Sequence, residues 1–332
     1  MTLAAWLGIV DPPGQPPDRR PAILLEGSLN DVEALWPTID TALRRRADYH
    51  LIIAVPDADH EKARQRFSHE RVVRDSSLAG SRRHRRGIAL VIDGSANSDL
   101  VSTTIDGLPA RTEPAADAIG ACVASLLPFF GSRRLTSIAA LNGALGSPET
   151  ILCLGNGPSS EDTALDRYSD ATLFRVNWTW QVRGKFRRPD AVFTADPDQP
   201  PDGLRPILVF PCAMGGRRVL AQHLLAFRPP RAGYLFVDEL SPAIADMSAP
   251  LVPTNGALMI AVAAALKPRR LVIAGMDLYR HPQGRYPGSG AIEGYARGHS
   301  ADCDLSLISQ ALAGFAGEVE LLSPNLKTAL GR

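Results

Sequence analysis

The sequence lacks the features that most directly mark a disulfide-bonded, zinc-binding or nucleic-acid-binding protein. It has four cysteines in 332 residues, namely Cys122, Cys153, Cys212 and Cys303. They are far apart and form no C-x-x-C pair, which favours reduced thiols in a cytosolic compartment over a disulfide framework or a zinc site. The formal net charge is only +1, so no global electrostatic field indicates a nucleic-acid partner.

Long hydrophobic runs are also absent. The longest, at 118–130 and 256–266, are shorter than the roughly 20 apolar residues that cross a bilayer, and we expect both to form buried helices. The N-terminal segment has no basic residue before its short apolar run, which argues against a signal peptide. Apolar residues make up 45% of the chain and charged residues 21%, as in ordinary folded domains, and the length favours two domains.

The sequence contains no convincing metal site. Three D-x-D triplets occur, at 57–59, 196–198 and 302–304, but chance readily produces them. Asp302 and Asp304 are expected in the first turn of a helix, where carboxylates are favoured. Asp196, at a predicted strand end, is the one worth testing. We expect no required metal and no cofactor.

The first 130 residues or so predict a small α/β layer without a catalytic constellation. The expected strands are 21–27, 49–57 and 88–94, and the expected helices are 28–46, 58–67 and 114–131. The basic run at 81–87 is interpreted as a solvated loop. Contact with an anionic glycan or a membrane surface is the second interpretation.

The second half predicts a doubly wound, mostly parallel Rossmann-like sheet. Near-continuous apolar runs, typical of strands buried on both faces, lie at 151–155, 172–177, 190–195, 206–211, 233–238, 270–275 and 318–324. Helical patterns fall at 214–227, 254–267 and 300–315. The chain therefore divides into a smaller N-terminal α/β domain at 1–132, a connector at 133–150 and a larger domain at 151–332.

A glycine-rich turn, Gly155-Asn156-Gly157-Pro158-Ser159, follows the first strand of the larger domain. It is neither a G-x-G-x-x-G fingerprint nor a Walker loop. Ligands of such sheets collect at the carboxyl edge, where glycines let the backbone come close to them. Pro158 fits the first turn of a helix whose exposed N–H groups favour an anion. A purely structural turn is the alternative.

Asparagines follow two neighbouring strands of the predicted sheet. The amide of Asn156 can both donate to and accept from a sugar or phosphate, which favours a binding role for the glycine-rich turn. Asn177 ends the next strand, where it would bring a second amide over the same crevice. The alternative, that Asn177 only caps a turn, is equally compatible with its position.

Two predicted helix starts carry polar residues. Thr254-Asn255-Gly256 opens a buried helix and offers a cap and free N–H groups. His299 precedes the helix at 300–315, where the helix dipole disfavours the charged imidazole. A neutral imidazole can act as a general base. The alternative is a helix-entry histidine that hydrogen-bonds a carbonyl.

The strand at 270–275 leads into a run of potential ligands. Gly275 and Asp277 stand at its end, Tyr279 follows, and Tyr286 comes on the next loop. Two phenols near an anion site can hydrogen-bond a leaving phosphate. Taken singly, each tyrosine also fits a core or rim position.

The order of these motifs makes the second half resemble the bacterial sialyltransferases of glycosyltransferase family 42. The motifs are "GNGPS" (155–159), "FRVN" (174–177), "AVF" (191–193), "TNG" (254–256), "AGMDLY" (274–279), "GHS" (298–300) and "LLSPN" (321–325). The resemblance covers roughly 151–325. The same glycine–asparagine start occurs in related proteins of the flagellin-glycosylation group, so the family is better defined than the sugar.

The resemblance implies an inverting, metal-independent transfer of sialic acid from a CMP-activated donor to a hydroxyl of a bacterial surface glycan. His299 would be the base that takes the proton from the acceptor hydroxyl. Tyr279 and Tyr286 would hydrogen-bond the departing phosphate. The residues implied to bind the donor and its nucleotide are Gly155, Asn156, Gly157, Ser159, Asn177, Asp196, Thr254, Asn255, Gly256, Gly275 and Asp277.

The sequence departs from the family pattern at three places. Asn255 replaces the usual serine of the Thr-Ser-Gly motif, and Asp196 stands where an asparagine is usual. The tyrosine loop is richer in positive charge, and Arg280 or Arg285 would suit the carboxylate of sialic acid, Kdo and other nonulosonic acids. The resemblance does not reach 1–132, which is interpreted as an acceptor-binding or docking domain.

Other functions stay open at this point. The sugar could be Kdo or another nonulosonic acid on CMP. Diphosphate transfer to a pterin would need Mg²⁺ and acidic ligands, and a non-catalytic nucleotide- or glycan-binding protein would not need His299. The expected partners are a CMP-sugar and a glycan acceptor, with no nucleic acid. A cytoplasmic location is expected, and both a peripheral contact with the inner membrane and a homo-oligomer stay open.

Overall fold

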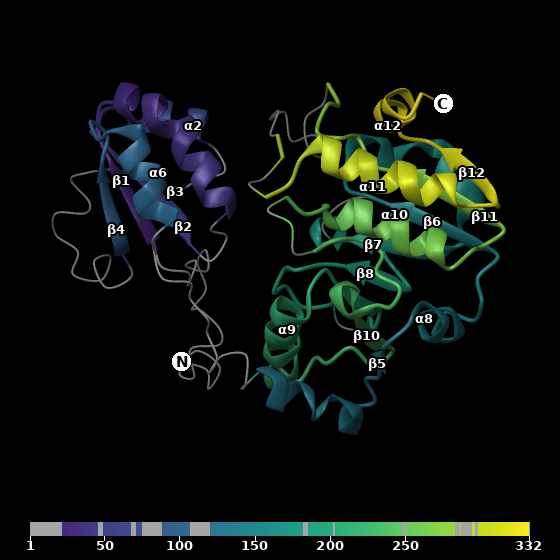
Figure 1. The fold of residues 1–332 in the computed structure, drawn as a ribbon. Coiled ribbons are helices and arrows are strands. Elements are labelled where there is room, and N and C mark those ends of the chain that lie inside the picture. The colour runs from purple at the N-terminus through teal and green to yellow at the C-terminus, as the bar shows by residue number, and fades with distance from the viewer. Residues whose placement is uncertain are drawn as a thin grey trace. The chain divides into compact units, whose positions relative to one another are not determined.

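The structure, a computed structural model, forms two compact units (Figure 1). It describes residues 22–45, 49–67, 71–74, 88–106, 120–181, 185–201, 203–247, 249, 251–282, 286, 294–295 and 298–331. The smaller unit comprises the described residues up to 106, and the larger unit contains nearly all those from 120 onward. The basic run at 81–87 and Arg285 lie outside the described residues.

The smaller unit is a parallel sheet with the strand order β3-β2-β1-β4. Its elements are β1 (Ala22–Glu26), α2 (Leu29–Arg45), β2 (His50–Val55), α3 (His60–Arg66), β3 (Arg71–Arg74), β4 (Ile88–Asp93) and α6 (Ser98–Asp106). The three predicted strands are confirmed, and α2 continues through Pro37. Neither β3 nor α6 was predicted. The core forms where Ile23 and Leu25 pack against the apolar face of α2.

The larger unit contains an eight-stranded sheet with the order β12-β11-β6-β7-β8-β9-β10-β5. Its strands are β5 (Arg134–Leu135), β6 (Thr150–Leu154), β7 (Thr172–Val176), β8 (Ala191–Phe193), β9 (Ile207–Phe210), β10 (Gly233–Phe236), β11 (Arg270–Ala274) and β12 (Glu318–Leu321). Every pairing between them is parallel. All seven predicted strands are confirmed.

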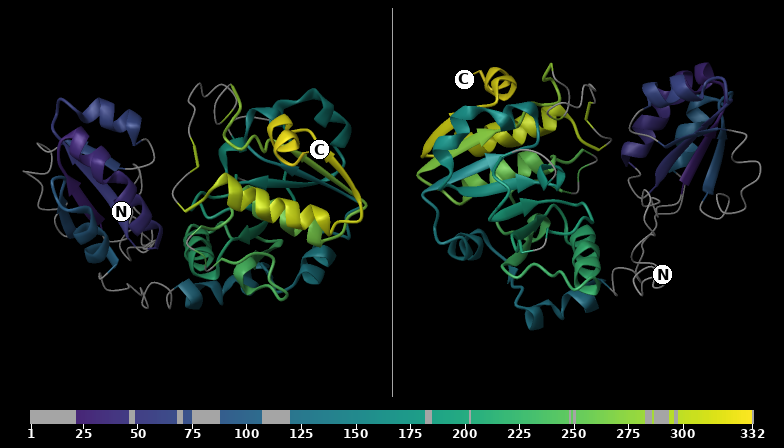
Figure 2. Two further views of the ribbon diagram at one scale, coloured as in Figure 1. Left: turned by 45° about the horizontal axis from the view of Figure 1, so that its top comes forward. Right: turned by 180° about the vertical axis from the view of Figure 1, so that it is seen from behind.

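Both faces of this sheet are covered, as the doubly wound prediction requires. The helices of the larger unit are α8 (Ile138–Ala144), α9 (Ala213–Leu225), α10 (Asn255–Ala265), α11 (Ala301–Ala313) and α12 (Pro324–Ala329). In β9, Ile207 and Val209 join the core beneath α10, while Leu208 and Phe210 join the core beneath α9. Figure 1 shows α10 and α11 in front of the sheet, and Figure 2 shows the sheet from behind.

The strand order reverses between β6 and β11. The chain leaves β6 toward β7 on one side, whereas β11 and β12 lie on the other. A ligand crevice is expected outside such a point, at the carboxyl ends of the strands. Here the two backbones nearly touch, because the Gly155 N–H donates to the Ala274 carbonyl (2.8 Å) and the Gly157 N–H to the Gly275 carbonyl (2.9 Å).

Two local expectations were wrong. The predicted helix after Pro158 is a single 3₁₀ turn, η2 (Pro158–Glu161). The segment 118–130 was expected to be one buried helix, but its described part turns at residues 125–126, where Pro128 disfavours continuation, and enters a 3₁₀ helix that leaves Phe129 86% exposed. The segment 133–150, which was predicted to be a connector, contains α8 and the edge strand β5.

None of the helices among the described residues combines the length and apolar character that crossing a bilayer requires.

The contact at the switch point predicts a sharp difference between two Gly→Ala substitutions. A Cβ at Gly155 would lie 2.2 Å from the Gly275 carbonyl oxygen, which belongs to rigid backbone. We expect Gly155→Ala to lower the free energy of unfolding by about 1–3 kcal/mol or more. Urea unfolding followed by tryptophan fluorescence measures the change.

Gly143→Ala is the matched control, because nothing lies within 4 Å of a Cβ added to this residue of α8. It should be neutral or stabilise by up to about 1 kcal/mol. Equal effects of the two substitutions would show that the approach of the two strand ends is not tight.

Candidate functional site

A buried hydrogen-bond network joins the turns that follow β6 and β11. The Ser159 hydroxyl accepts from the Gly275 N–H (2.9 Å) and lies 3.0 Å from the Ser323 hydroxyl, which accepts from the Met276 N–H (2.9 Å). The Ser159 N–H donates to Oδ2 of the buried Asp277 (2.9 Å). Ser159, Gly275 and Asp277 therefore lie at the predicted edge, where they fix the two turns to each other.

The N–H groups of the turn that begins at Pro158 were predicted to be exposed and to attract an anion, but this network already uses one of them. The N–H of Ser159, in the turn after Pro158, is already hydrogen-bonded to the Asp277 carboxylate. A Cβ at Gly157 would lie 2.4 Å from the same carboxylate. A one-turn 3₁₀ helix has only a small dipole, and the Asp277 carboxylate already interacts with its N-terminal end.

The three predicted asparagines converge at the carboxyl edge. Asn156 donates its Nδ2 to the carbonyl of Val176 (2.9 Å), the residue before Asn177. Asn255 donates its Nδ2 to Oδ1 of Asn177 (2.9 Å). Asn177 adopts a φ of 47°, a left-handed conformation that asparagine tolerates better than most residues. Amide groups from three elements thus meet at the ends of β6, β7 and α10.

Thr254 and Gly256 hold the start of α10. The Thr254 hydroxyl accepts from the Ala257 N–H (3.3 Å) as the helix N-cap. The same residue donates its N–H (2.8 Å) and its hydroxyl (2.7 Å) to the carboxylate of Asp304 in α11. Asp304 is only 1% exposed, and burial raises its pKa although the Thr254 hydrogen bonds oppose the shift. A Cβ at Gly256 would lie 2.4 Å from the Met276 side chain.

The imidazole of His299 is held in one tautomer. Its Nδ1 lies 2.8 Å from the carbonyl oxygen of Val252. A carbonyl only accepts, so Nδ1 carries the proton and Nε2 of the neutral ring has a free lone pair. Ser300 caps α11 directly afterwards by accepting from the Cys303 N–H (3.1 Å). The hydrogen bond to a carbonyl that the alternative interpretation expected is present, and it leaves Nε2 able to accept a proton.

Tyr279 is connected to His299 through Tyr295 and Asp304. Its ring makes an edge-to-face contact with Tyr295, with ring centroids 4.7 Å apart. Burial and the neighbouring Asp304 raise the pKa of Tyr295, and His299 acts electrostatically on the same carboxylate. Tyr279 has a φ of 56°, so the chain turns sharply here. Tyr286 is half-buried, and Arg280 is exposed.

Sequence reasoning missed two residues of this region, Tyr295 and Arg175. Arg175 is 1% exposed and lies in β7, and burial lowers the pKa of its guanidinium to about 9. In the sequence, a cation within an otherwise apolar strand was the feature that could have identified Arg175. Tyr295 stands shortly before the "GHS" motif, and nothing in the sequence distinguished it from a rim residue.

Asp196 lies on a separate segment that follows β8. Its N–H donates to the Thr194 hydroxyl (2.9 Å), and its side chain is half-buried. The next turn is held by the fully buried His223 of α9, whose Nε2 lies 2.8 Å from the Asp198 carbonyl oxygen. His223 is therefore neutral with its proton on Nε2, and burial lowers its pKa.

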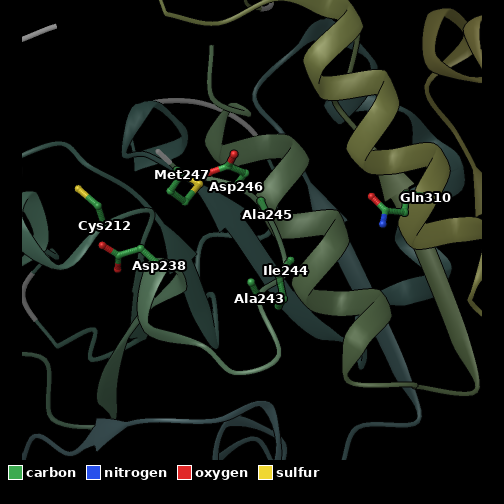
Figure 3. Close-up of a pocket in the computed structure, with 8 residues that line it drawn as sticks. All are labelled: Cys212, Asp238, Ala243, Ile244, Ala245, Asp246, Met247 and Gln310. Carbon is green, nitrogen blue, oxygen red and sulfur yellow. The ribbon is translucent and has the colours of Figure 1, made fainter. Parts of the chain in front are cut away.

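An open pocket of about 640 Å³ lies elsewhere in the larger unit (Figure 3). The residues lining it are Cys212, Asp238, Ala243, Ile244, Ala245, Asp246, Met247 and Gln310. Asp238 already accepts from the Ala213 N–H at the start of α9 (2.9 Å). None of the predicted site residues that the structure describes lines this pocket.

Within the described ranges, no three histidine, cysteine, aspartate or glutamate side chains are grouped as a metal ion would require. The four cysteines are free thiols.

No protein-family model and no curated protein matches the chain. Solved structures of bacterial sialyltransferases do. A variant of sialyltransferase CstII in complex with CMP is 17% identical with a TM-score of 0.39, covering 54% of this chain and 82% of that chain. CstII from Campylobacter jejuni in complex with the substrate analogue CMP-3FNeuAc is 17% identical, with a TM-score of 0.36 over 55% of this chain and 83% of that one.

An α-2,3-sialyltransferase from Campylobacter jejuni in apo form is 15% identical with a TM-score of 0.34, covering 53% of this chain and 76% of that chain. Likeness at this level assigns no activity to this chain.

The buried imidazole of His223 predicts a pH-dependent stability. Because the folded-state pKa is lowered, the unfolded chain binds the proton first, and stability falls as pH drops below about 6.5. The contribution is full above that value and changes by at most about 1.4 kcal/mol per pH unit. Urea unfolding between about pH 5 and pH 8 should show this slope in the wild type, and His223→Gln should remove it. An unchanged slope in the variant would assign the pH dependence to other groups.

Proposed function

We propose that the larger unit is a glycosyltransferase that uses a CMP-activated sugar of the sialic-acid type. The observation that carries the proposal is the segment leading into α10. Val252 fixes His299 so that Nε2 is basic, and shortly afterwards Asn255 bonds Asn177 at the strand edge. A proton acceptor and a set of amide groups suited to a phosphate or sugar are therefore tied to one short piece of chain.

The order of the seven motifs gives the proposal its specificity. From "GNGPS" to "LLSPN", they follow one another in an order that resembles that of the family 42 sialyltransferases. The solved structures reported above include complexes with CMP and with a CMP-sugar analogue. We propose CMP as the donor nucleotide because the motifs of this chain resemble those of that family.

The chemistry is a single displacement at the sugar carbon that carries the phosphate. The acceptor hydroxyl attacks from the face opposite the phosphate, and its proton passes to Nε2 of His299. The bond between this carbon and the phosphate oxygen breaks, and CMP leaves with the bonding electrons. Tyr279 and Tyr286 donate hydrogen bonds to the departing phosphate, in place of a cation. One displacement inverts the configuration of the sugar carbon.

For the sugar we propose a class only, namely sugars that carry a carboxylate. Arg280 is exposed next to Tyr279 and suits the carboxylate that sialic acids share with Kdo and other nonulosonic acids. CMP-Kdo is therefore a necessary second donor in any assay.

The proposal is tested by release of CMP from CMP-sialic acid and from CMP-Kdo, with excess EDTA in every reaction. We expect turnover of at least one donor, unaffected by EDTA. His299→Ala should lower turnover roughly 10²- to 10⁴-fold, the usual contribution of a general base. Thermal stabilisation by CMP should be retained in this variant.

His60→Ala, in α3 of the smaller unit, is the control for replacing a half-buried histidine, and its CMP release should match the wild type. Loss of turnover in EDTA would refute the metal-free mechanism. Full activity of His299→Ala would show that His299 is not the base, and absence of turnover in the wild type with CMP binding retained would indicate a protein that only binds the nucleotide.

Tyr279→Phe tests the phenol that we place on the leaving phosphate. Loss of one donor to the developing charge should lower kcat about 100-fold, with little change in KM. Tyr234→Phe removes a hydroxyl from the core beneath α9 and should leave kcat unchanged. If the two variants have the same kcat, Tyr279 does not act on the leaving group.

A further inference from the structure

The buried cation Arg175 has a structural setting that the proposed mechanism does not use. It lies in β7 between Phe174 and Val176, which face the core beneath α10. Since successive side chains of a strand alternate, Arg175 points to the opposite face of the sheet. Its side chain is 1% exposed, and an arginine is almost never that buried unless a partner neutralises it.

The guanidinium reaches the glycine-rich turn after β6. Its Nη1 donates to the Gly155 carbonyl (3.3 Å), and its Nη2 donates to Oδ1 of Asn156 (3.3 Å). On the other side it lies 5.8 Å from the ring centre of Trp180, whose indole N–H donates to the Asn177 carbonyl (2.7 Å). Arg175 thus lies between the two turns that carry Asn156 and Asn177.

These contacts determine which way the Asn156 amide points. A guanidinium only donates, so the amide oxygen must face Arg175. The amide nitrogen then faces the Val176 carbonyl, to which it donates (2.9 Å). Both ends of the amide are therefore fixed before a ligand binds.

No carboxylate among the described residues balances this charge. The hydrogen bonds of Arg175 go to neutral oxygens, and its Nε is buried without a partner. Burial alone accounts for the lowered pKa of about 9, and the group still carries its charge at neutral pH. An unpaired buried charge is costly, so the fold favours an anion supplied from outside.

We propose that Arg175 is a positioning residue of the donor site, whose guanidinium orients Asn156 and provides the buried positive charge that the donor phosphate neutralises. This role rests on the proposed function, because it takes the phosphate from a CMP-activated donor. Gly155 is part of the same arrangement, because its carbonyl accepts a hydrogen bond from Arg175. A side chain at position 155 would clash with the carbonyl of Gly275 in the turn after β11.

The test compares the binding of CMP with that of cytidine, which lacks the phosphate. Arg175→Met keeps much of the length of the side chain and removes its charge. Calorimetry on the full chain should show CMP binding weakened roughly 10- to 100-fold, the usual effect of losing a charge-assisted hydrogen bond, with cytidine binding unchanged. Arg175→Lys retains the charge but not the forked geometry, so it should give an intermediate Kd for CMP.

Arg217→Met is the matched control. Arg217 also stacks on an aromatic ring, that of Phe236, but it is paired with Glu239 and is not part of the candidate site. This variant should bind CMP and cytidine as the wild type does. If Arg175→Met does not fold, the same CMP-to-cytidine comparison on Arg175→Lys decides, because weaker binding of CMP alone is expected there.

The outcomes separate this role from the proposed function. If the wild type binds no CMP, the proposed function and the role of Arg175 fall together. If the wild type binds CMP and the Arg175 variants bind it equally well, only the role of Arg175 is overturned. A parallel loss of CMP and cytidine binding would show that Arg175 supports only the general shape of the site, and would also overturn it.

Discussion

The site depends on the close approach of two backbones at the point where the strand order reverses. The turns after β6 and β11 share hydrogen bonds and leave no room for a side chain at Gly155. This contact brings the glycine-rich turn next to the segment that carries Asp277 and Tyr279. Ser159 and Asp277, which are 118 residues apart in the sequence, thereby share the edge of the sheet at which ligands of parallel α/β sheets bind.

Most polar groups at this edge hydrogen-bond to one another and serve to hold the turns and helix starts together. Ser159 and Asp277 hold the turns together, while Thr254 and Asp304 join the starts of α10 and α11. Hydrogen-bonded in this way, they hold the edge rigid, as a preorganised site requires. The asparagine amides are also hydrogen-bonded, but an amide has two N–H groups and two lone pairs and can bind a ligand as well. Nε2 of His299 can accept a proton, and Arg175 provides a buried charge beside Asn156.

The sequence allowed the sheet to be predicted well and the side-chain partnerships poorly. Strands buried on both faces leave near-continuous apolar runs, which is why all seven strands from β6 to β12 were found. The two-residue strand β5 leaves no such run, and the 3₁₀ turn after Pro158 depends on the distant Asp277. Arg175 was visible as a cation in an apolar strand, but only the structure shows that no carboxylate among the described residues pairs with it.

We propose that the switch-point edge holds a CMP donor with His299 as the base. A crystal structure of the complex with CMP would test this proposal. We expect the phosphate to lie beside Asn156 and Asn177, with Tyr279 within hydrogen-bond distance and Nε2 of His299 facing the site. Nucleotide bound instead in the pocket between Asp238 and Gln310, with the asparagine edge empty, would contradict it.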